Sequence, residues 1–179
     1  MDLLSWTDII IQIFLRLSPV WASLIILFFV SFSFKRSLGL YGKLFDSTIG
    51  MIGFAIVMFW VFAGFFAGAM DWIITHDPLA QFSGMKNKVP GTPLRGAEDG
   101  DFSHFLFGGD HLARDVFSRM IAGSTIVIII APMATLFAFM VGITLGVPAG
   151  YYGGRLDTVI SFIANLILAF PVILIFYLL

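Results

Sequence analysis

The sequence GGDHLARDVFSR at residues 108–119 decides how the rest of the chain is read, because it is charged and turn-forming and is followed by almost uncharged sequence. Residues 120–150 form a long apolar run, which the short segment YYGGRLD at 151–157 separates from another apolar run. Charges confined to the boundaries of apolar runs are typical of membrane helices, which need about 20 apolar residues each. This stretch therefore predicts two membrane helices joined by a turn.

The composition extends this prediction to the whole chain. Of 179 residues, 59% are hydrophobic and 12% are charged, whereas an average soluble domain has about 25% charged residues. Four long apolar runs account for the difference, so we expect an all-α, polytopic membrane bundle of about four transmembrane helices. The net charge of −1 argues against nucleic acid as a partner. The absence of cysteine excludes disulfides and thiolate metal ligands.

The first apolar run, residues 9–34, has two readings. It contains Arg16 and Pro19. In one reading a helix spans the membrane from residue 17 to residue 34, and the Arg16 side chain reaches back to the interface. In the other, the run is an interfacial helix in the headgroup plane. Residues 24–30 are apolar all round, which favours the spanning helix.

The charged segments predict the topology. Lys35, Arg36 and Lys43 accompany a single acidic residue, Asp46, between the first two runs. Short basic connectors lie on the cytoplasmic side of membranes. The long polar segment 71–119 is rich in turn-forming residues and has a lower density of basic residues. We therefore place that segment outside the cytoplasm.

Small residues predict where helices pack closely. The second run, residues 47–70, carries Gly64 and Gly68 in GxxxG spacing, for which packing within the chain is the simpler explanation. Pro132 and Pro171 predict kinks in the third and fourth runs. A spacing of four keeps side chains on one helix face. Small residues recur at this spacing in the third run, at Ala134, Ala138, Gly142, Gly146 and Gly150.

The turn between the third and fourth runs has its own signals. Gly153 and Gly154 are suited to ending the third helix, and Asp157 is placed to cap the fourth. Ser161 and Asn165 are four residues apart, so they share one helix face. Polar groups at membrane depth seek a partner or a water-lined path.

Three histidines and two aspartates are candidate ligands for a metal site. His76, His104 and His111, with Asp110 and Asp115, supply possible ligands. The spacing of the last two histidines matches no familiar zinc pattern, so we expect solvated loop histidines instead and predict no metal and no cofactor.

Other chemistry has less support. Ser118 and Ser124 have no evident catalytic base, and no glycine-rich segment matches a P-loop. We therefore expect no enzymatic activity. The most ordered charges precede the third run, where capping and interface anchoring compete with a gate or docking role. They are Asp110, Arg114, Asp115 and Arg119.

At this point the sequence resembles a known family. Residues 107–119, FGGDHLARDVFSR, resemble the "FGTDxLGRDVxSR" signature of C-type permease subunits of dipeptide, oligopeptide and nickel ABC importers. Residues 146–157 and 165–171 resemble its "GxxxGyfGGxxD" turn and "DxxLAFP" helix. There are departures: Gly109 stands where the family has Thr, Ala113 where it has Gly, and Asn165 where Asp is frequent. The loss of glycine at position 113 requires the turn there to accept a Cβ.

The resemblance implies an architecture. Residues 1–46 would be an extra membrane helix and its basic connector, 47–118 the first permease helix and a periplasmic loop, and 119–179 the start of the permease core. The N-terminus would then be outside if the first run spans the membrane and inside if it is interfacial. The family's EAA-type coupling loop would lie beyond residue 179, so we expect a truncated permease that is inactive alone.

The resemblance also implies partners. These would be a second permease subunit, two ATP-binding subunits, a periplasmic substrate-binding protein and the lipid of a bacterial inner membrane. Peptides, nickel chelates and sugars remain open as substrates. The alternative is a stand-alone small membrane protein with an assembly or regulatory role.

Overall fold

The computed structural model of the chain describes residues 2–35, 37, 39–94 and 102–169, and they are mostly helical. They fall into two compact units, residues 1–129 and residues 130–179. The elements in chain order are α1 (Trp6–Arg16), α2 (Ser18–Ser33), α3 (Gly39–Lys43), η1 (Leu44–Asp46), α4 (Thr48–Gly68), β1 (Thr92–Pro93), β2 (His104–Phe105), α5 (Val116–Tyr152) and α6 (Gly154–Ala169).

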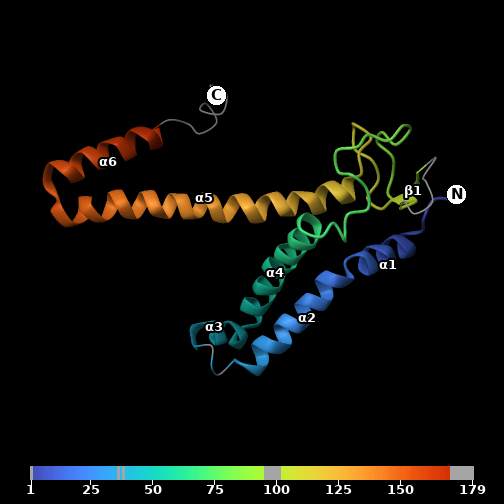
Figure 1. The fold of residues 1–179 in the computed structure, drawn as a ribbon, viewed down its shortest axis with the longest axis horizontal. Helices are drawn as coiled ribbons and strands as arrows, with labels where there is room; N and C mark the ends of the chain where they lie inside the picture. The colour runs from blue at the N-terminus through green and yellow to red at the C-terminus, as the bar shows by residue number, and fades with distance from the viewer. Residues whose placement is uncertain (1, 36, 38, 95–101, 170–179) are drawn as a thin grey trace. The chain divides into compact units, whose positions relative to one another are not determined.

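In the first unit, α2 and α4 form an antiparallel pair (Figure 1). Helix α4 lies within the predicted run, and its start is set by Ser47, whose Oγ accepts a hydrogen bond from the amide of Gly50 at 3.3 Å. The helices bury Val20 and Leu24 of α2 against Ala63 of α4. Small side chains on α4 thus let the larger residues of α2 approach closely.

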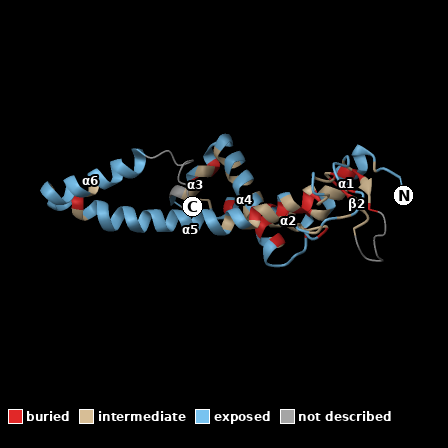
Figure 2. Cartoon of the chain, turned by 90° about the horizontal axis from the view of Figure 1, so that it is seen from above, coloured by how far each residue is buried: buried red, intermediate tan, exposed pale blue. Residues whose placement is uncertain are grey.

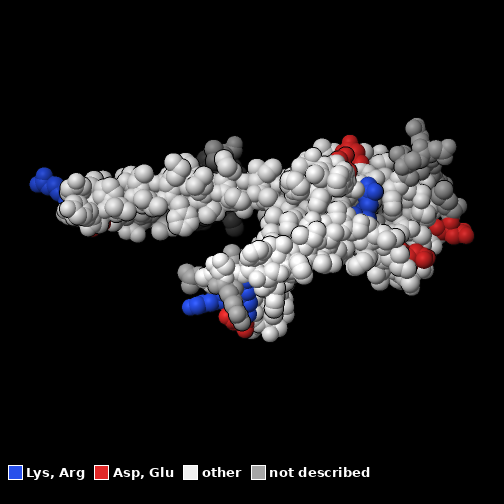
Figure 3. All heavy atoms as spheres, turned by 60° about the horizontal axis from the view of Figure 1, so that its bottom comes forward, with Lys and Arg blue, Asp and Glu red and all other residues white. Residues whose placement is uncertain are grey.

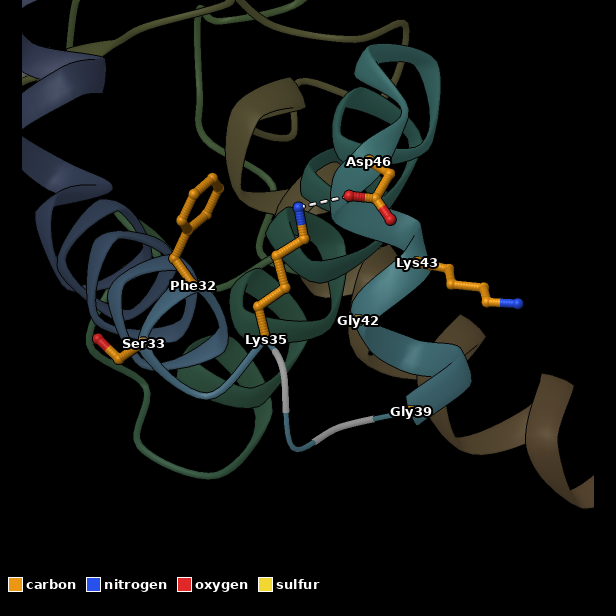
Figure 4. A pocket seen from close by; sticks show the side chains of 7 residues that line it. All are labelled: Phe32, Ser33, Lys35, Gly39, Gly42, Lys43 and Asp46. Carbon is orange, nitrogen blue, oxygen red and sulfur yellow. Dashed lines mark ion pairs between the residues drawn. The ribbon is translucent and has the colours of Figure 1, made fainter.

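The connector, residues 35–46, closes the far end of this pair. Lys35 Nζ forms an ion pair of 2.6 Å with Asp46 Oδ1. Figure 4 shows this pair beside a surface hollow, while the Lys43 side chain points away from the pair. Phe45 is buried and contacts Phe28 edge-on. Residues 39–46 thus form two short helical segments, α3 and η1, at one end of the helix pair.

The N-terminal run forms two helices. Helices α1 and α2 meet at Leu17 with a bend of 58°. Helix α2 coincides with the spanning reading, which began at residue 17, whereas neither reading gave α1 as a separate helix. Pro19 lies in the first turn of α2, where proline is tolerated because the missing amide has no helical acceptor. The Nη2 of Arg16 donates to the carbonyl of Ile74.

The N-terminus lies at the same end of the helix pair as the long polar segment (Figure 1). The amide of Leu4 donates to the carbonyl of Gly91 at 3.0 Å, and His104 Nε2 lies 3.3 Å from the carbonyl oxygen of Asp2. The connector lies at the opposite end. The two readings of the first run implied opposite sides for the N-terminus, and this arrangement supports a spanning α2 with the N-terminus beside the polar segment.

The polar segment is more than a set of turns. Residues 69–115, here called the loop module, contain a two-stranded antiparallel sheet that pairs Thr92 with Phe105. Met85, Leu94 and Phe105 form a small core of their own. The prediction of an all-α chain is confirmed for its bulk, but it missed this folded module.

The glycines of the GxxxG motif pack inside the chain. A Cβ at Gly64 would collide with the side chain of Ile128, and one at Gly68 would collide with Thr125. The Thr125 hydroxyl donates to the carbonyl of Gly64 at 2.9 Å. These glycines therefore allow α4 to pack closely on the first turns of α5 within the same chain.

The described residues include two helices long and apolar enough to cross a membrane, α4 and α5, or three if the bent pair α1–α2 is one span. Figure 3 shows few charges along the helices, with most of them at their ends and around the loop module. The chain is thus a multi-pass membrane protein. A fourth span stays a prediction, since α6 runs toward residues outside those described, and Pro171 is one of them.

In the second unit, α5 continues through Pro132 as one helix, so that proline does not end it; the bend expected there stays a prediction. The helix stops before Gly153, which has a φ of +61°. Asp157 does not precede α6 as expected but lies in its first turn, where Oδ1 accepts a hydrogen bond from Ser161 Oγ at 3.2 Å. Asn165 is exposed on the same helix.

The small-residue stripe is also exposed. Among the described residues, no atom outside the neighbouring backbone lies within 4 Å of a Cβ built at Gly142, Gly146 or Gly150. Ala134 and Ala138 are exposed as well. Figure 2 shows α6 exposed along almost its whole length, with buried residues concentrated in the first unit.

Candidate functional site

Two polar clusters form where the loop module joins α5. The first is a turn organised by Asp110, whose Oδ1 accepts hydrogen bonds from the amides of Leu112 at 2.8 Å and Arg114 at 2.9 Å. Its Oδ2 accepts from Arg114 Nε at 2.8 Å. Arg119 Nε lies 3.6 Å from the same oxygen, and its Nη1 donates to the carbonyl of Pro78 at 3.3 Å. One carboxylate thus joins the turn to the first helical turn of α5.

The electrostatics of Asp110 follow from these contacts. Burial by itself would raise the pKa of this carboxyl, since it disfavours the charged form. The hydrogen bonds from the amide and side chain of Arg114, and from the amide of Leu112, outweigh that effect and lower the pKa to about 2. Asp110 is therefore ionised at any pH that the protein meets in a cell.

The second cluster, here called the Ser118 network, consists of Thr75, His76, Asp115 and Ser118. Asp115 caps α5, because its Oδ1 accepts a hydrogen bond from the amide of Phe117 at 3.1 Å. Its Oδ2 accepts from the hydroxyls of Thr75 and Ser118, both at 2.7 Å, and contacts His76 Nδ1 at 3.0 Å. Ser118 Oγ in turn accepts the amides of Thr75 and His76 at 3.2 and 2.9 Å.

The Ser118 network is buried, with Asp115 and Ser118 at 0% exposure and His76 at 8%. Burial would raise the pKa of Asp115, but hydrogen bonds from His76, Thr75 and Ser118 outweigh it and hold the pKa below its usual value. His76 Nε2 lies 2.7 Å from the carbonyl oxygen of Phe102. Both nitrogens of the buried ring therefore contact an oxygen, Nε2 that of the Phe102 carbonyl and Nδ1 that of the Asp115 carboxylate.

The proximity of Ser118, His76 and Asp115 does not make a catalytic triad. In a triad the serine hydroxyl bonds to a histidine nitrogen. Here the Ser118 hydroxyl donates to Asp115, and His76 Nε2 is occupied by a backbone carbonyl. No group of metal-ligating side chains is found among the described residues. The network is suited to fastening the loop module onto α5.

The structure divides the set of charges that the sequence singled out. Asp110, Arg114 and Arg119 come together in the Asp110 turn, whereas Asp115 points into the Ser118 network. The expectation that the loop histidines are solvated is wrong for His76. Sequence reasoning missed it because its partner lies 39 residues away. A histidine two residues after the apolar segment Trp72-Ile73-Ile74 was the available signal.

The two departures in the signature segment lie in this same turn. Ala113 has a φ of +60°, so the turn accepts a Cβ in the left-handed region, as expected. Gly109 has no such freedom, because a Cβ there would collide with the carbonyl oxygen of Met85. The backbone of the loop module therefore fills the space that a threonine would need.

Known proteins were compared with the chain. No protein-family profile and no solved structure matches it. A dipeptide transport system permease protein of Alkalihalophilus pseudofirmus is 30% identical over 128 residues, covering 72% of this chain and 38% of that protein. A glutathione transport system permease protein of Pectobacterium atrosepticum is 41% identical over 76 residues, covering 42% of this chain and 25% of that protein.

A further relative carries a different substrate name. A nickel transport system permease protein of Escherichia coli is 35% identical over 71 residues, covering 40% of this chain and 25% of that protein. The chain spans between a quarter and two fifths of the length of these three curated relatives. Over the matched lengths, the chain is similar to permease proteins of dipeptide, glutathione and nickel transport systems, as the resemblance of its signature residues predicted.

Proposed function

We propose that the chain forms part of the substrate translocation pathway of a peptide-class ABC importer in a bacterial inner membrane. Its similarity over 128 residues to a dipeptide permease is the observation that carries this proposal. Transport then proceeds by movement of helices between outward- and inward-open states, with ATP hydrolysis on separate subunits. In this scheme residues 1–46 are an added membrane segment, 47–118 the first permease helix and loop, and 119–179 the start of the core.

The partners in this proposal are a second permease subunit, two ATP-binding subunits and a substrate-binding protein. The exposed small-residue stripe of α5, from Ala134 to Gly150, supports contact with the second permease, because small side chains allow close helix approach. The loop module with its Asp110 turn is the surface offered to a binding protein. Arg114 and Arg119 are then held by Asp110 in the orientation that the loop module presents.

Co-purification tests the proposal. The full chain is expressed with a second permease and two ATPases from its own organism, and the complex is isolated through a tag on one ATPase. Gly142→Leu with Gly146→Leu is expected to abolish recovery of this chain. Ile143→Leu with Val147→Leu, at the same spacing on the neighbouring face, is the matched control and is expected to leave recovery unchanged. Equal recovery of both double variants contradicts the stripe as the contact.

The rival function, an assembly or regulatory membrane protein, makes a different prediction. Removal of the chain would then change the amount of an importer without removing a component of it. Uptake of labelled dipeptide, normalised to the amount of assembled importer, separates the two. Normalised uptake that persists without the chain supports the rival.

A further inference from the structure

The outward face of α1 is apolar. Trp6, Ile10 and Phe14 follow one another at a spacing of four, and they are 70%, 63% and 59% exposed. Leu15, at 64%, extends the same surface. A surface helix of a soluble domain turns its apolar side chains toward the protein. An exposed apolar surface of this kind marks contact with another protein or with a membrane.

Two polar side chains in the second half of α1 point toward the protein instead. Arg16 donates to the carbonyl of Ile74, and its Nε is buried, as is Gln12 Oε1. Ile9 is buried against Gly91 of the loop module, whereas Thr7 and Asp8 in the first turn are exposed. The second half of α1 thus turns polar groups toward the protein while large apolar side chains face outward.

The length and direction of α1 exclude a simple continuation of the span. Its 11 residues measure about 16 Å, against a hydrocarbon core of about 30 Å. It departs from α2 by 58°. Transmembrane helices tilt by about 20° on average, so α1 can lie at up to about 78° to the membrane normal, which is close to the membrane plane.

Neighbouring residues place the bend at the level of the membrane interface. A surface hollow beside it is lined by the guanidinium-bearing Arg16, by Pro19 and by Trp72, which follows the end of α4. Arginine and tryptophan side chains are both favoured at the headgroup level. The hollow is also lined by Leu15 of α1 and Ala22 of α2, and the exposed Ile26 and Phe29 follow Ala22 on one face of α2. Lipid is the occupant that fits these apolar surfaces on both helices.

We infer that α1 is an interfacial helix whose Trp6–Phe14 face rests in the lipid headgroup region, and that it holds the loop module against the membrane surface. The hold acts through the Leu4–Gly91 hydrogen bond and the contact of Ile9 with Gly91. The run from residue 6 to residue 33 then has two roles, interfacial in α1 and spanning in α2. This inference does not depend on what the importer carries.

Spin labels test the inference in the full chain, reconstituted in nanodiscs of phosphatidylcholine and phosphatidylglycerol. The chain has no cysteine, so each single-cysteine variant needs no other change. Ile10→Cys and Phe14→Cys report on the outward face. Lys86→Cys, exposed in the loop module, is the aqueous control, and Ile56→Cys, exposed in the middle of α4, is the hydrocarbon control. Collision rates with oxygen and with a water-soluble nickel chelate give the depth of each label.

The two α1 labels are expected at about 5–10 Å below the headgroup surface, between the two controls. Nickel accessibility equal to that of Lys86→Cys overturns the inference, because the face would be in water. Low accessibility to both reagents overturns it as well, because a protein would cover the face. Depths equal to that of Ile56→Cys also overturn it, since α1 would then be part of the span.

Discussion

Neutralising Asp115 provides the sharpest test of how the loop module is fastened to α5. In the unchanged chain, one carboxylate oxygen of Asp115 accepts from Phe117, and the other contacts Thr75, Ser118 and His76. In Asp115→Asn the side chain keeps its shape, but an NH₂ group replaces one of these two oxygens. Whichever way the amide is oriented, an N–H faces a donor, and the network loses its carboxylate charge.

The magnitude follows from these losses. A hydrogen bond to a charged group contributes about 1.5–3 kcal/mol. Since every 1.4 kcal/mol is a factor of ten, the loss of one such bond should make local opening of the loop module about 10- to 140-fold more frequent in the variant.

Hydrogen–deuterium exchange of the full chain in nanodiscs measures this opening. The amides of Thr75 and His76 are the reporters, because both donate to Ser118 Oγ. Asp77→Asn is the matched control, since Asp77 is exposed and its Oδ1 accepts only the amide of Leu79. An asparagine can keep that bond, so exchange should change by less than about threefold. Protection of Thr75 and His76 in Asp115→Asn within twofold of the unchanged chain would refute the reasoning.

Three further perturbations are read by thermal unfolding of the full chain in detergent. Gly64→Leu should destabilise it by about 1–3 kcal/mol, because the new side chain meets Ile128; Gly53→Leu, which has open space, should not, and equal effects would contradict close packing of α4 on α5. Ala113→Val should cost about 1–2 kcal/mol at a φ of +60°, whereas Ala113→Gly should be tolerated; equal tolerance of both would show that the turn is unstrained. The low pKa of Asp110 means that its ionised form contributes stability above a pH of about 3.8, which is lost as the pH falls toward about 2. The difference between the unchanged chain and Asp110→Asn should therefore shrink over that interval, and a constant difference would contradict the assigned contacts.

The helices could be predicted because their signals are local. The predicted run 47–70 contains the whole of α4. Ser47 caps the start of this helix, and an uninterrupted apolar stretch follows. The spanning reading placed a helix start at residue 17, next to the start of α2, but it gave no separate helix before Leu17. Apolar residues continue on both sides of the bend, and Pro19 is compatible with a helix start as well as with a kink. Only the packing of Arg16 and Ile9 on the loop module distinguishes these outcomes.

The site was predicted less completely because its contacts are distant in sequence. The Asp110 turn is local, so the signature segment was sufficient to identify it. The pairing of His76 with Asp115 joins segments 39 residues apart, and neither residue carries a sign of the other. The loop module was read as turns for the same reason: its core residues Met85 and Phe105 are 20 residues apart, and neither lies in a long apolar run.

The close approach at Gly109 has a consequence for exchanging segments between this chain and related permeases. Its α-carbon lies against the carbonyl of Met85, and its amide donates to the carbonyl of Lys88 at 3.0 Å. Introducing the threonine of the signature at this position alone would displace the turn, residues 85–88, that carries both carbonyls. A chimaera that replaces residues 82–91 together with 107–119 keeps the two surfaces matched. The two segments therefore have to be exchanged together, and the signature segment cannot be exchanged by itself.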